Sequence, residues 1–552
     1  MRTRPADSAI AESTEPPPEP AKVRIAVLLD SPTPAPWATA VIEALRRNPD
    51  IQVQAMVIAH QSSKSEPSPS LLFRCYSILD SLRIPGGKRR NGVSSGLPIL
   101  PVIPLELTSE GQRLNGTALT KLKELDSDIL LNLAVRHSVR ELAEATKSGI
   151  WEFRSRGVAL QVNPYLGFWE VYQNEPITKV SLAAVSPSGE EKEIAESGLR
   201  THRNSLSINR AQALRCAPIL VRYGINWLRK QATEERLNHR PRQEAHTNEH
   251  SRSPRGPEIL RFGLRNCASI IKGRATARSR KLQWSIGITS AAPASLSSRH
   301  LANARWLTPD SSRFFADPFP IEHQGRKYIF FEELPFTSRK GRIAVIELLP
   351  DGTLSAPRTV LETGFHLSYP LVFEEQGKLY MLPEQSSTDR IALYEAVSFP
   401  DVWKQAKVLV EGFAGIDSSL LQHRGRWWLF TSLGEHGNQD NNLHVFHAKS
   451  LWDRFEPHPL NPVKMDISSS RMAGKLFFDG ETLIRPAQNC SSRYGGSVVF
   501  HEVTRLSEKH YEERALREVL PSPESPFGLG FHTVNSSGSI TMVDGLRVLD
   551  AP

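Results

Sequence analysis

Carboxyl side chains recur at matching positions in the second half of the chain. Asp317 and Asp417 each lie eight residues before a repeated glycine, and Glu332 and Glu384 each lie seven residues after one. Cleavage at a sugar carbon needs two carboxyl groups that face each other across the bond, one of them protonated. Asp317, Asp417 and Glu384 are therefore the predicted catalytic residues, with Glu332 a further candidate acid. The alternative is structural, because Asp before Pro is common in turns and two serines follow Asp417.

Planar hydrogen-bond donors and one histidine follow further along the chain. Guanidinium and amide groups suit sugar hydroxyls and phosphates. The predicted ligand-binding residues are Arg471, Arg485, Gln488, Asn489, Tyr494 and His532. A lone histidine is more often structural than metal-binding, and the four cysteines have no CxxC spacing, so we predict neither a metal site nor a cofactor.

These residues belong to an internal repeat. A turn of a polar residue and glycine leads into aromatic or aliphatic residues five times, with spacings of 52, 48, 55 and 58 residues between the glycines. A period of this length suits a four-stranded blade. The sequence predicts a five-bladed β-propeller over residues 283–552, in which Gln283–Ala291 or the RWL segment after it closes the last blade. Inner strands of such a fold bring side chains together around one axis.

The first half alternates strand and helix patterns. Val23–Asp30 reads as a buried parallel strand, Trp37–Arg47 as a helix and Ile51–Ile58 as the next strand, and DILLNL adds another further on. This order predicts an open α/β domain over residues 22–230. Residues 1–21 are expected to be a disordered leader. No glycine-rich phosphate loop follows the first strand, so nucleotide binding is unsupported.

The net charge of +9 comes largely from one stretch between Arg229 and Lys281. Its composition predicts a basic linker over residues 231–282, either a solvated tether or a peripheral contact with anionic lipid or glycan, rather than a nucleic-acid site. A mean hydropathy of −0.34, with no long apolar run or secretory signal, predicts a cytoplasmic protein.

The second half resembles a known family through FADPF, SYP, LPE, DSSL, RPAQN, YGG and GFHTVN. It is similar to the N-terminal domain of the glucosamine inositolphosphorylceramide transferases of plants and to bacterial relatives. The wider shape resembles the five-bladed glycoside hydrolases and fructosyltransferases. That resemblance implies an Asp base or nucleophile on the first blade, here Asp317, a second Asp on a middle blade, here Asp417, and a Glu acid. It also implies that a histidine such as His532 can lie near a calcium-associated centre.

The first half resembles the formyltransferase domain, a Rossmann-like fold, through VRIAVLLD, DILLNL, GIWEF and GFWEVYQNEP. The family's Asn and His would fall in the segment Ile150–Ser155, which reads IWEFRS and has no histidine. Near the position of the family's Asp, the carboxylates are Glu190 or Glu196. Arg cannot transfer a proton at neutral pH, so the resemblance implies a fold that has lost its chemistry.

Together these features predict a glycan-assembly or glycan-modifying protein whose propeller recognises a sugar, a sugar nucleotide or a glycolipid head group. An active enzyme is the first alternative, a transferase before a glycosidase. A scaffold that binds partner proteins at the propeller rim is the second, and it predicts an exposed apolar patch away from the axis.

Overall fold

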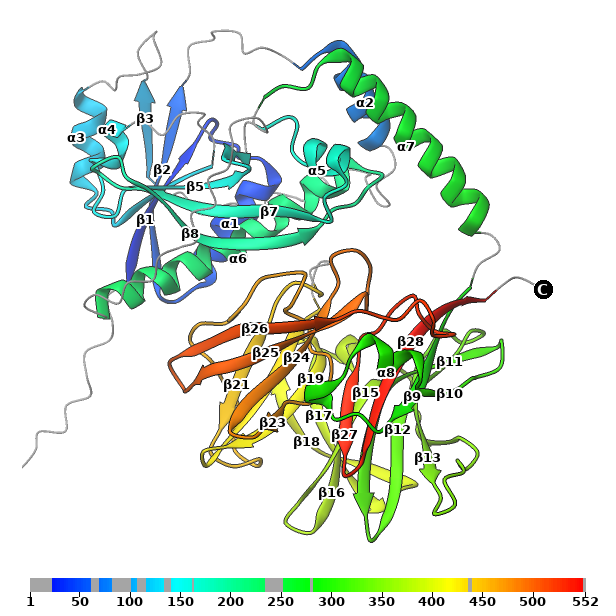
Figure 1. Cartoon of the computed structure of the whole chain (residues 1–552). Helices are drawn as coiled ribbons and strands as arrows, with labels where there is room; N and C mark the ends of the chain where they lie inside the picture. Colours follow the sequence, from blue (N-terminus) through cyan, green and yellow to red (C-terminus); the bar gives the residue numbers. More distant parts are fainter. Residues whose placement is uncertain are drawn as a thin grey trace, which may run out of the picture.

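The computed structural model describes residues 22–60, 69–81, 101–106, 116–133, 140–160, 163–233, 252–277, 281–434 and 439–549. Figure 1 shows two parts, an α/β domain and a domain of β-sheets. The leader predicted for residues 1–21 lies outside the described residues. Within the ranges given above, no helix is both long enough and apolar enough to cross a membrane.

The first domain is built on one mixed sheet with the strand order β3-β2-β1-β4-β5-β7-β8, and the short β6 pairs with β5. The first five strands in this order are parallel, and β7 and β8 are antiparallel. The strands are β1 (Val23–Leu29), β2 (Ile51–His60), β3 (Val102–Glu106), β4 (Ile129–Asn132), β5 (Ile150–Ser155), β6 (Val158–Ala159), β7 (Ile177–Val185) and β8 (Glu191–Arg200). The βαβ start expected from the sequence is present.

Helices cover both faces of this sheet. Alternate residues of β1 pack against α1 (Pro36–Arg47) and α6 (Leu206–Thr233), whereas Ala26 and Leu28 pack against α3 (Gly116–Glu124) and α4 (Arg140–Ala143). Side chains on successive residues of a strand point to opposite faces, so a strand covered on both sides is apolar throughout, as VRIAVLL is.

Part of the predicted linker belongs to the first domain. Helix α7 (Gly256–Ala277) lies within residues 231–282 and buries Ile259 and Phe262 against Phe168 and other aromatic residues of α2 (Leu71–Ser81) and α5 (Phe168–Gln173). Ile259 and Phe262 lie at helical spacing, but the many basic residues around them favour a linker when the sequence is considered alone. Residues 234–251 of the predicted linker lie outside the described part.

The second domain is a five-bladed β-propeller, as predicted. Each blade is a four-stranded sheet. The first blade contains β11 (Arg313–His323), β12 (Arg326–Pro335), β13 (Arg342–Leu348) and β14 (Arg358–Leu361), and the second contains β15 (Ser368–Glu375), β16 (Lys378–Glu384), β17 (Arg390–Ser398) and β18 (Val402–Glu411). The third contains β19 (Gly415–His423), β20 (Arg426–Leu433), β21 (His444–Ala448) and β22 (Glu456–Pro457), and the fourth contains β23 (Phe477–Asp479), β24 (Thr482–Asn489), β25 (Ser497–Leu506) and β26 (Tyr511–Val519). The fifth contains β27 (Val534–Ser537), β28 (Ile540–Leu549), β9 (Lys281–Thr289) and β10 (Arg305–Leu307).

The repeated glycines form the first hairpin turn of every blade. All five have a positive φ, a conformation that glycine adopts without a steric penalty. They are Gly325, Gly377, Gly425, Gly480 and Gly538. Each lies one or two residues after the end of the inner strand of its blade, which is why the repeat can be seen in the sequence.

The last blade is closed by strands from the two ends of the propeller. Strand β9 pairs with β28 from Lys281 opposite Leu549 to Thr289 opposite Thr541, and β10 pairs with β9. Both candidate closing segments are therefore used, where the sequence analysis expected one.

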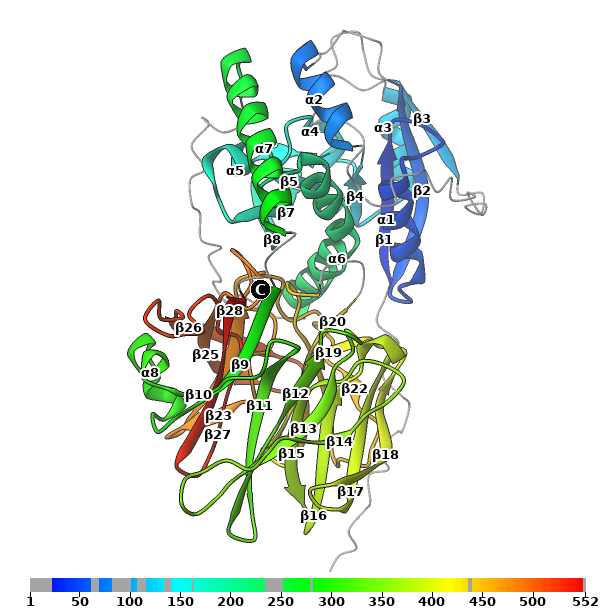
Figure 2. The same ribbon diagram turned by 90° about the vertical axis from the view of Figure 1, so that its right-hand side faces the viewer.

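Strand β8 of the first domain lies against the propeller (Figures 1 and 2). The backbone of Gly198 accepts a hydrogen bond from Ile467 N at 3.1 Å and donates one to Met465 O at 3.4 Å. A Cβ atom at Gly198 would lie only 3.2 Å from Asp466 Oδ1. Close backbone approach thus connects the two domains beside the propeller axis.

Candidate functional site

Three inner-strand residues share an unusual backbone position. Asp317, Tyr369 and Asp417 have φ values of 52°, 47° and 49°, and each lies where the register between the first two strands of its blade shifts. Non-glycine residues with positive φ are uncommon, and β-bulges re-aim side chains. The bulge therefore turns all three side chains into the buried centre of the propeller, which confirms that the repeat places Asp317 and Asp417 equivalently.

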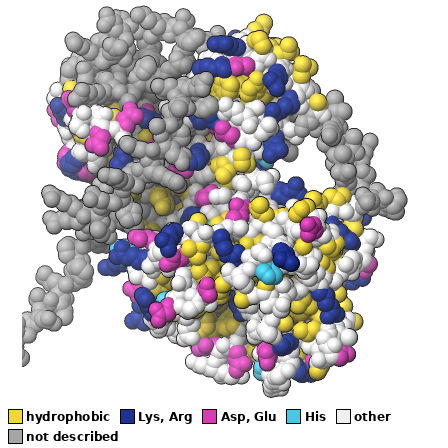
Figure 3. Space-filling model, viewed as in Figure 1, with side chains coloured by type: hydrophobic (Ala, Val, Ile, Leu, Met, Phe, Trp, Pro, Cys, Tyr) yellow, Lys and Arg dark blue, Asp and Glu magenta, His cyan; other side chains and the backbone are white. Residues whose placement is uncertain are grey.

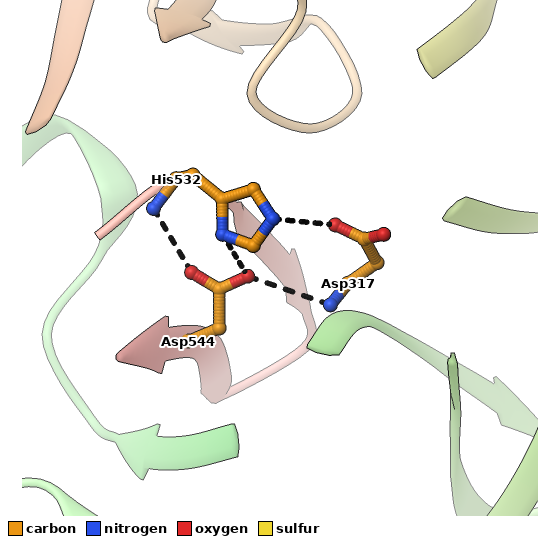
Figure 4. Close-up of side chains that lie close together, drawn as sticks. All are labelled: Asp317, His532 and Asp544. Carbon is orange, nitrogen blue, oxygen red and sulfur yellow. Dashed lines mark hydrogen bonds and ion pairs between the residues drawn. The ribbon is translucent and has the colours of Figure 1, made fainter. Parts of the chain in front are cut away.

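Asp317, His532 and Asp544 form a tight buried cluster (Figure 4). His532 Nε2 lies 3.3 Å from Asp317 Oδ1, and its Nδ1 lies 2.6 Å from Asp544 Oδ2. Thr533 donates its hydroxyl hydrogen bond to Asp317 Oδ1 at 2.8 Å. Asp544 also accepts backbone hydrogen bonds from His532 and Thr533, at 2.9 and 3.0 Å. The imidazole ring thus lies between two carboxylates.

This arrangement favours the charged forms of His532 and Asp317. Burial alone would lower the pKa of His532, but Asp544 and Asp317 outweigh it and raise that pKa to about 10. Burial likewise acts to raise the pKa of Asp317, yet the hydrogen bond and charge of His532 lower it. Asp317 is therefore an ionised carboxylate held in one orientation.

Glu332, on the second strand of the same blade, has the opposite tendency. Its burial, followed by the charges of Asp317 and Glu384, raises the pKa of Glu332 well above its usual range. Its Oε1 has no hydrogen-bond partner among the described residues, although His366 Nε2 lies 3.4 Å away. Burial lowers the pKa of His366, which leaves that ring neutral. The axis thus brings an ionised carboxylate near a carboxyl group that favours its proton.

Asp417 is held by donors from the fourth blade. Arg471 Nε and Gln488 Nε2 both donate to Asp417 Oδ2 at 2.7 Å. The backbone N–H of Asp417 donates to Glu384 Oε2 at 3.3 Å, so Glu384 also lies at the axis. Burial raises the pKa of Asp417, while Arg471 acts to lower it. The predicted residues Asp417, Glu384, Arg471 and Gln488 therefore come together.

Aromatic rings line the side of the site formed by Arg471 and His532. The guanidinium carbon of Arg471 lies 4.9 Å from the ring centroid of Tyr494. The ring of Tyr494 lies 5.3 Å from that of His532, which in turn lies 4.1 Å from Trp284 of β9. Tyr494 and His532 thus border the axis, as predicted, and Trp284 joins them.

Ion pairs extend from the axis to the first domain. Asp440 Oδ1 accepts from Arg471 at 3.0 Å, and its Oδ2 accepts from Arg200 of β8, also at 3.0 Å. Arg200 and Asp440 line a cavity of about 210 Å³ between the domains, together with Leu199, His202, Gln212, Gln439, Asn441 and Ile467. The first domain thus contacts the residues that hold Asp417.

Two predicted ligand residues have other roles. Arg485 is fully buried, donates to Glu513 at 2.6 and 2.7 Å, and also donates to the backbone oxygens of Ser469 and Ser470. Asn489 binds Glu518 and the nearby Ser491. Arg485 and Asn489 lie an odd number of positions from Gln488, so strand alternation turns them to the opposite face of β24. Their prediction as ligand residues is corrected accordingly.

Sequence reasoning missed Asp544, Asp440 and Arg200. Asp544 follows the fifth repeated glycine within SITMVDG, so a search for carboxylates after every glycine would have found it. Asp440 lies in the connection between β20 and β21, and Arg200 comes from the other domain. For these two residues the sequence offers no comparable signal.

The cluster of Asp317, His532 and Asp544 has the geometry of a possible metal site. One ligand atom from each residue lies within 4.8 Å of the others. A metal ion would need His532 without its proton, whereas the raised pKa of His532 favours the protonated ring. The expectation that no metal binds here stays a prediction.

The first domain carries its own charge cluster at the IWEFRS segment, in which Glu152 is buried and Glu191 is exposed. Arg154 donates to Glu152 and to Glu191, both at 2.6 Å. Asn132 at the end of β4 lies 3.4 Å from Glu152 Oε2. Among the described neighbours of this cluster no histidine supplies the missing base.

His532 gives the propeller a pH-dependent stability. The pKa of His532 in the folded protein is about 10, above its ordinary value of 6.5. The contribution of the protonated ring to the free energy of unfolding is therefore complete below pH 6.5 and is lost as the pH rises through 10. In denaturant unfolding of the full chain, the free energy of unfolding of the propeller should fall by on the order of a few kcal/mol over this pH range. The His532→Gln variant, whose side chain does not titrate, should show a shallower slope. Equal slopes in the two proteins would contradict the His532 assignment.

Comparison with known proteins connects this geometry to a family. Residues 291–525 match the family described as glucosamine inositolphosphorylceramide transferase 1, N-terminal. Glucosamine inositolphosphorylceramide transferase 1 of Oryza sativa subsp. japonica is 33% identical over 251 residues, which are 43% of this chain and 34% of that protein. The Arabidopsis thaliana protein of the same name is 31% identical over 208 residues, covering 37% and 27%. The chain therefore spans about a third of the length of these curated relatives.

Comparison with solved structures finds glycoside hydrolases at low identity. The family 117 glycoside hydrolase Zg3597 of Zobellia galactanivorans has 14% identity and a TM-score of 0.32, covering 43% of this chain and 87% of its own. The RS223 beta-xylosidase has 12% identity and a TM-score of 0.33, covering 43% and 92%. The likeness to a family rests on the sequence matches alone: residues 291–525, which lie in the propeller, are similar to the N-terminal domain of glucosamine inositolphosphorylceramide transferase 1.

Proposed function

We propose that the propeller binds a carbohydrate at its axis, as a sugar, a sugar nucleotide or a glycolipid head group. The observation that carries this proposal is the convergence of side chains from all five blades on one buried polar centre. They are Asp317, Glu332, Glu384, Asp417, Arg471, Gln488 and His532, with Tyr494 and Trp284 beside them. Ligand pockets combine a few fixed polar groups with aromatic surface in this way. The relatives of the propeller are glucosamine inositolphosphorylceramide transferases, and a glycan-related ligand agrees with that name.

Glu332 is the residue best suited to contact a sugar hydroxyl. Its Oε1 is buried and has only a long contact of 3.4 Å with His366 Nε2, so a ligand hydroxyl that makes a shorter hydrogen bond would satisfy this oxygen better. A sugar hydroxyl can donate to that oxygen and accept from the protonated carboxyl group. Asp317 points its second carboxylate oxygen away from His532, which leaves that oxygen for a second hydroxyl (Figure 4).

Removing the Glu332 carboxyl group should weaken carbohydrate binding. Titration calorimetry of the full chain would use glucosamine, N-acetylglucosamine, inositol phosphate and UDP-N-acetylglucosamine. Glu332→Ala should lower the affinity for the best ligand about tenfold, the loss expected for one buried hydrogen bond. Glu411→Ala is the matched control, because Glu411 is exposed on an outer strand. Failure of every ligand to bind the wild type, or equal affinity for Glu332→Ala, would contradict an axial sugar site.

Cleavage of a glycosidic bond is the second candidate function. The observation that favours it is the opposite pKa shift of two neighbouring carboxyl groups, lowered in Asp317 and raised in Glu332. Glu332 would protonate the departing glycosidic oxygen, and Asp317 would attack the sugar carbon or take a proton from the attacking water. A transferase would use the same carboxyl pair with a sugar hydroxyl in place of water.

If Glu332 acts as the general acid, a variant without its acidic proton should cleave more slowly but bind the sugar equally well. Glu332→Gln keeps the shape of a protonated glutamate but has no acidic proton. With alkyl glycosides as substrates, whose leaving alcohol needs a proton, release of the alcohol by the wild type should fall at least about a hundredfold in this variant, the usual size of a general-acid contribution. Affinity for the product sugar should stay unchanged. Sugar binding with no turnover by the wild type would leave recognition as the function and rule out the hydrolase.

We further propose that the first domain has the formyltransferase fold and does not transfer formyl groups. Glu152 and Arg154 occupy the segment where the resembling family has its Asn and His. There Arg154 donates to Glu152 and to Glu191, both at 2.6 Å. An arginine in two ion pairs cannot accept the proton that an attacking amine must lose.

This inactivity can be measured directly. The full chain incubated with 10-formyltetrahydrofolate and an amino sugar should release no tetrahydrofolate above the enzyme-free rate. The double variant Glu152→Asn with Arg154→His restores the residue types of the resembling family and serves as the comparison. Steady release of tetrahydrofolate by the wild type would overturn the proposal.

A further inference from the structure

Exposed apolar side chains gather on two helices of the first domain. Among the described residues of that domain, the large hydrophobic side chains that are exposed lie on α2 and α7, apart from Val102 on β3. They are Leu71, Leu72, Ile78, Leu79, Leu260 and Leu264. Their exposed fractions run from 47% for Leu72 to 77% for Leu71. A single exposed leucine is ordinary, whereas a cluster of this kind marks an interaction surface.

The two helices lie side by side at the edge of the domain (Figures 1 and 2). Their shared interface is fixed by a hydrogen bond of 2.9 Å from Asn266 to Tyr76 Oη, and by edge-on packing of Tyr76 against Phe262 at 5.1 Å. Each helix turns a separate row outward: Leu71, Ile78 and Leu79 on α2, and Leu260 and Leu264 on α7, at helical spacings. The inner faces stabilise the domain, so the outer apolar rows need another explanation.

The exposed charges on these helices have one sign. Among the described side chains of α2 and α7, the exposed charged residues are Arg74, Arg261 and Arg265, while Asp80 is buried and Glu258 pairs with Arg252 at 2.5 Å. Figure 3 shows apolar and basic side chains close together at this end of the first domain. Residues 272–281, the first six of which are the end of α7, read KGRATARSRK and so include further basic residues.

We propose that the outer surface of α2 and α7 docks the protein onto an anionic lipid bilayer. Helices with an apolar face bordered by cations lie in the headgroup region, with leucine and isoleucine side chains in the acyl boundary and arginines on lipid phosphates. The single-signed charge favours a membrane over a second copy of this chain, whose identical surface would bring arginines against arginines. This surface lies away from the propeller axis, so lipid docking and carbohydrate binding are separate properties.

Vesicle flotation of the full chain tests the proposal. The protein should float with vesicles of phosphatidylcholine and phosphatidylserine, and far less with phosphatidylcholine alone or in high salt. Ile78→Gln combined with Leu264→Gln should lower the partition coefficient about tenfold or more, since each change removes buried apolar surface. Arg261→Glu should lower it about fivefold or more through the lost lipid attraction. None of these side chains is buried, so folding should be preserved.

The control variants carry the same changes on the propeller. Leu516→Gln combined with Leu520→Gln, and Arg454→Glu, alter exposed side chains of that domain and should leave flotation unchanged. No flotation of the wild type with anionic vesicles, or equal flotation of the α2 and α7 variants, would overturn the proposal. A dimer in solution that Leu264→Gln dissociates, together with absent flotation, would instead assign the surface to self-association. Calorimetry with the axial ligand reports on the propeller independently of either outcome.

Discussion

Charges buried at the propeller axis have to be paired, and this constraint shapes the centre of the molecule. An unpaired charge in such a place costs several kcal/mol, on the order of the stability of a whole domain. Asp317 is paired with His532, His532 with Asp544, and Asp417 with Arg471. The pairs of Asp317 with His532 and of Asp417 with Arg471 join residues of separate blades, so the closed ring of five blades and the charge cluster depend on each other.

The same pairing connects the two domains. Arg471 binds Asp440, and Asp440 binds Arg200 of β8, next to the backbone contact of Gly198 with residues 465–467. A change in how the first domain sits on the propeller would therefore alter the charge environment of Arg471 and Asp417. These ion pairs connect the first domain to the axis through Arg200, independently of its own charged cluster of Glu152 and Arg154.

The propeller and its axial aspartates could be predicted because one local rule repeats. A glycine with positive φ occupies the first hairpin turn of each blade, and in the first three blades a bulged inner-strand residue lies eight residues before it, so Asp317 and Asp417 could be placed from spacing alone. Arg485 was misassigned because spacing does not show which face of β24 points to the axis. Asp440 and Arg200 could not be found, since their positions depend on a connection and on domain docking. Helix α7 was hidden because charge dominated a stretch whose Ile259 and Phe262 carry the packing.

The central claim is that the propeller axis is a carbohydrate site, and the position of a bound ligand tests it most directly. A crystal structure of the full chain soaked with its tightest-binding sugar would locate that ligand. The account predicts density in contact with Glu332, Asp317 and Arg471, beside the ring of Tyr494. Ligand density only in the cavity beside Arg200 and Gln212, with the axial side chains keeping the contacts described above, would contradict it.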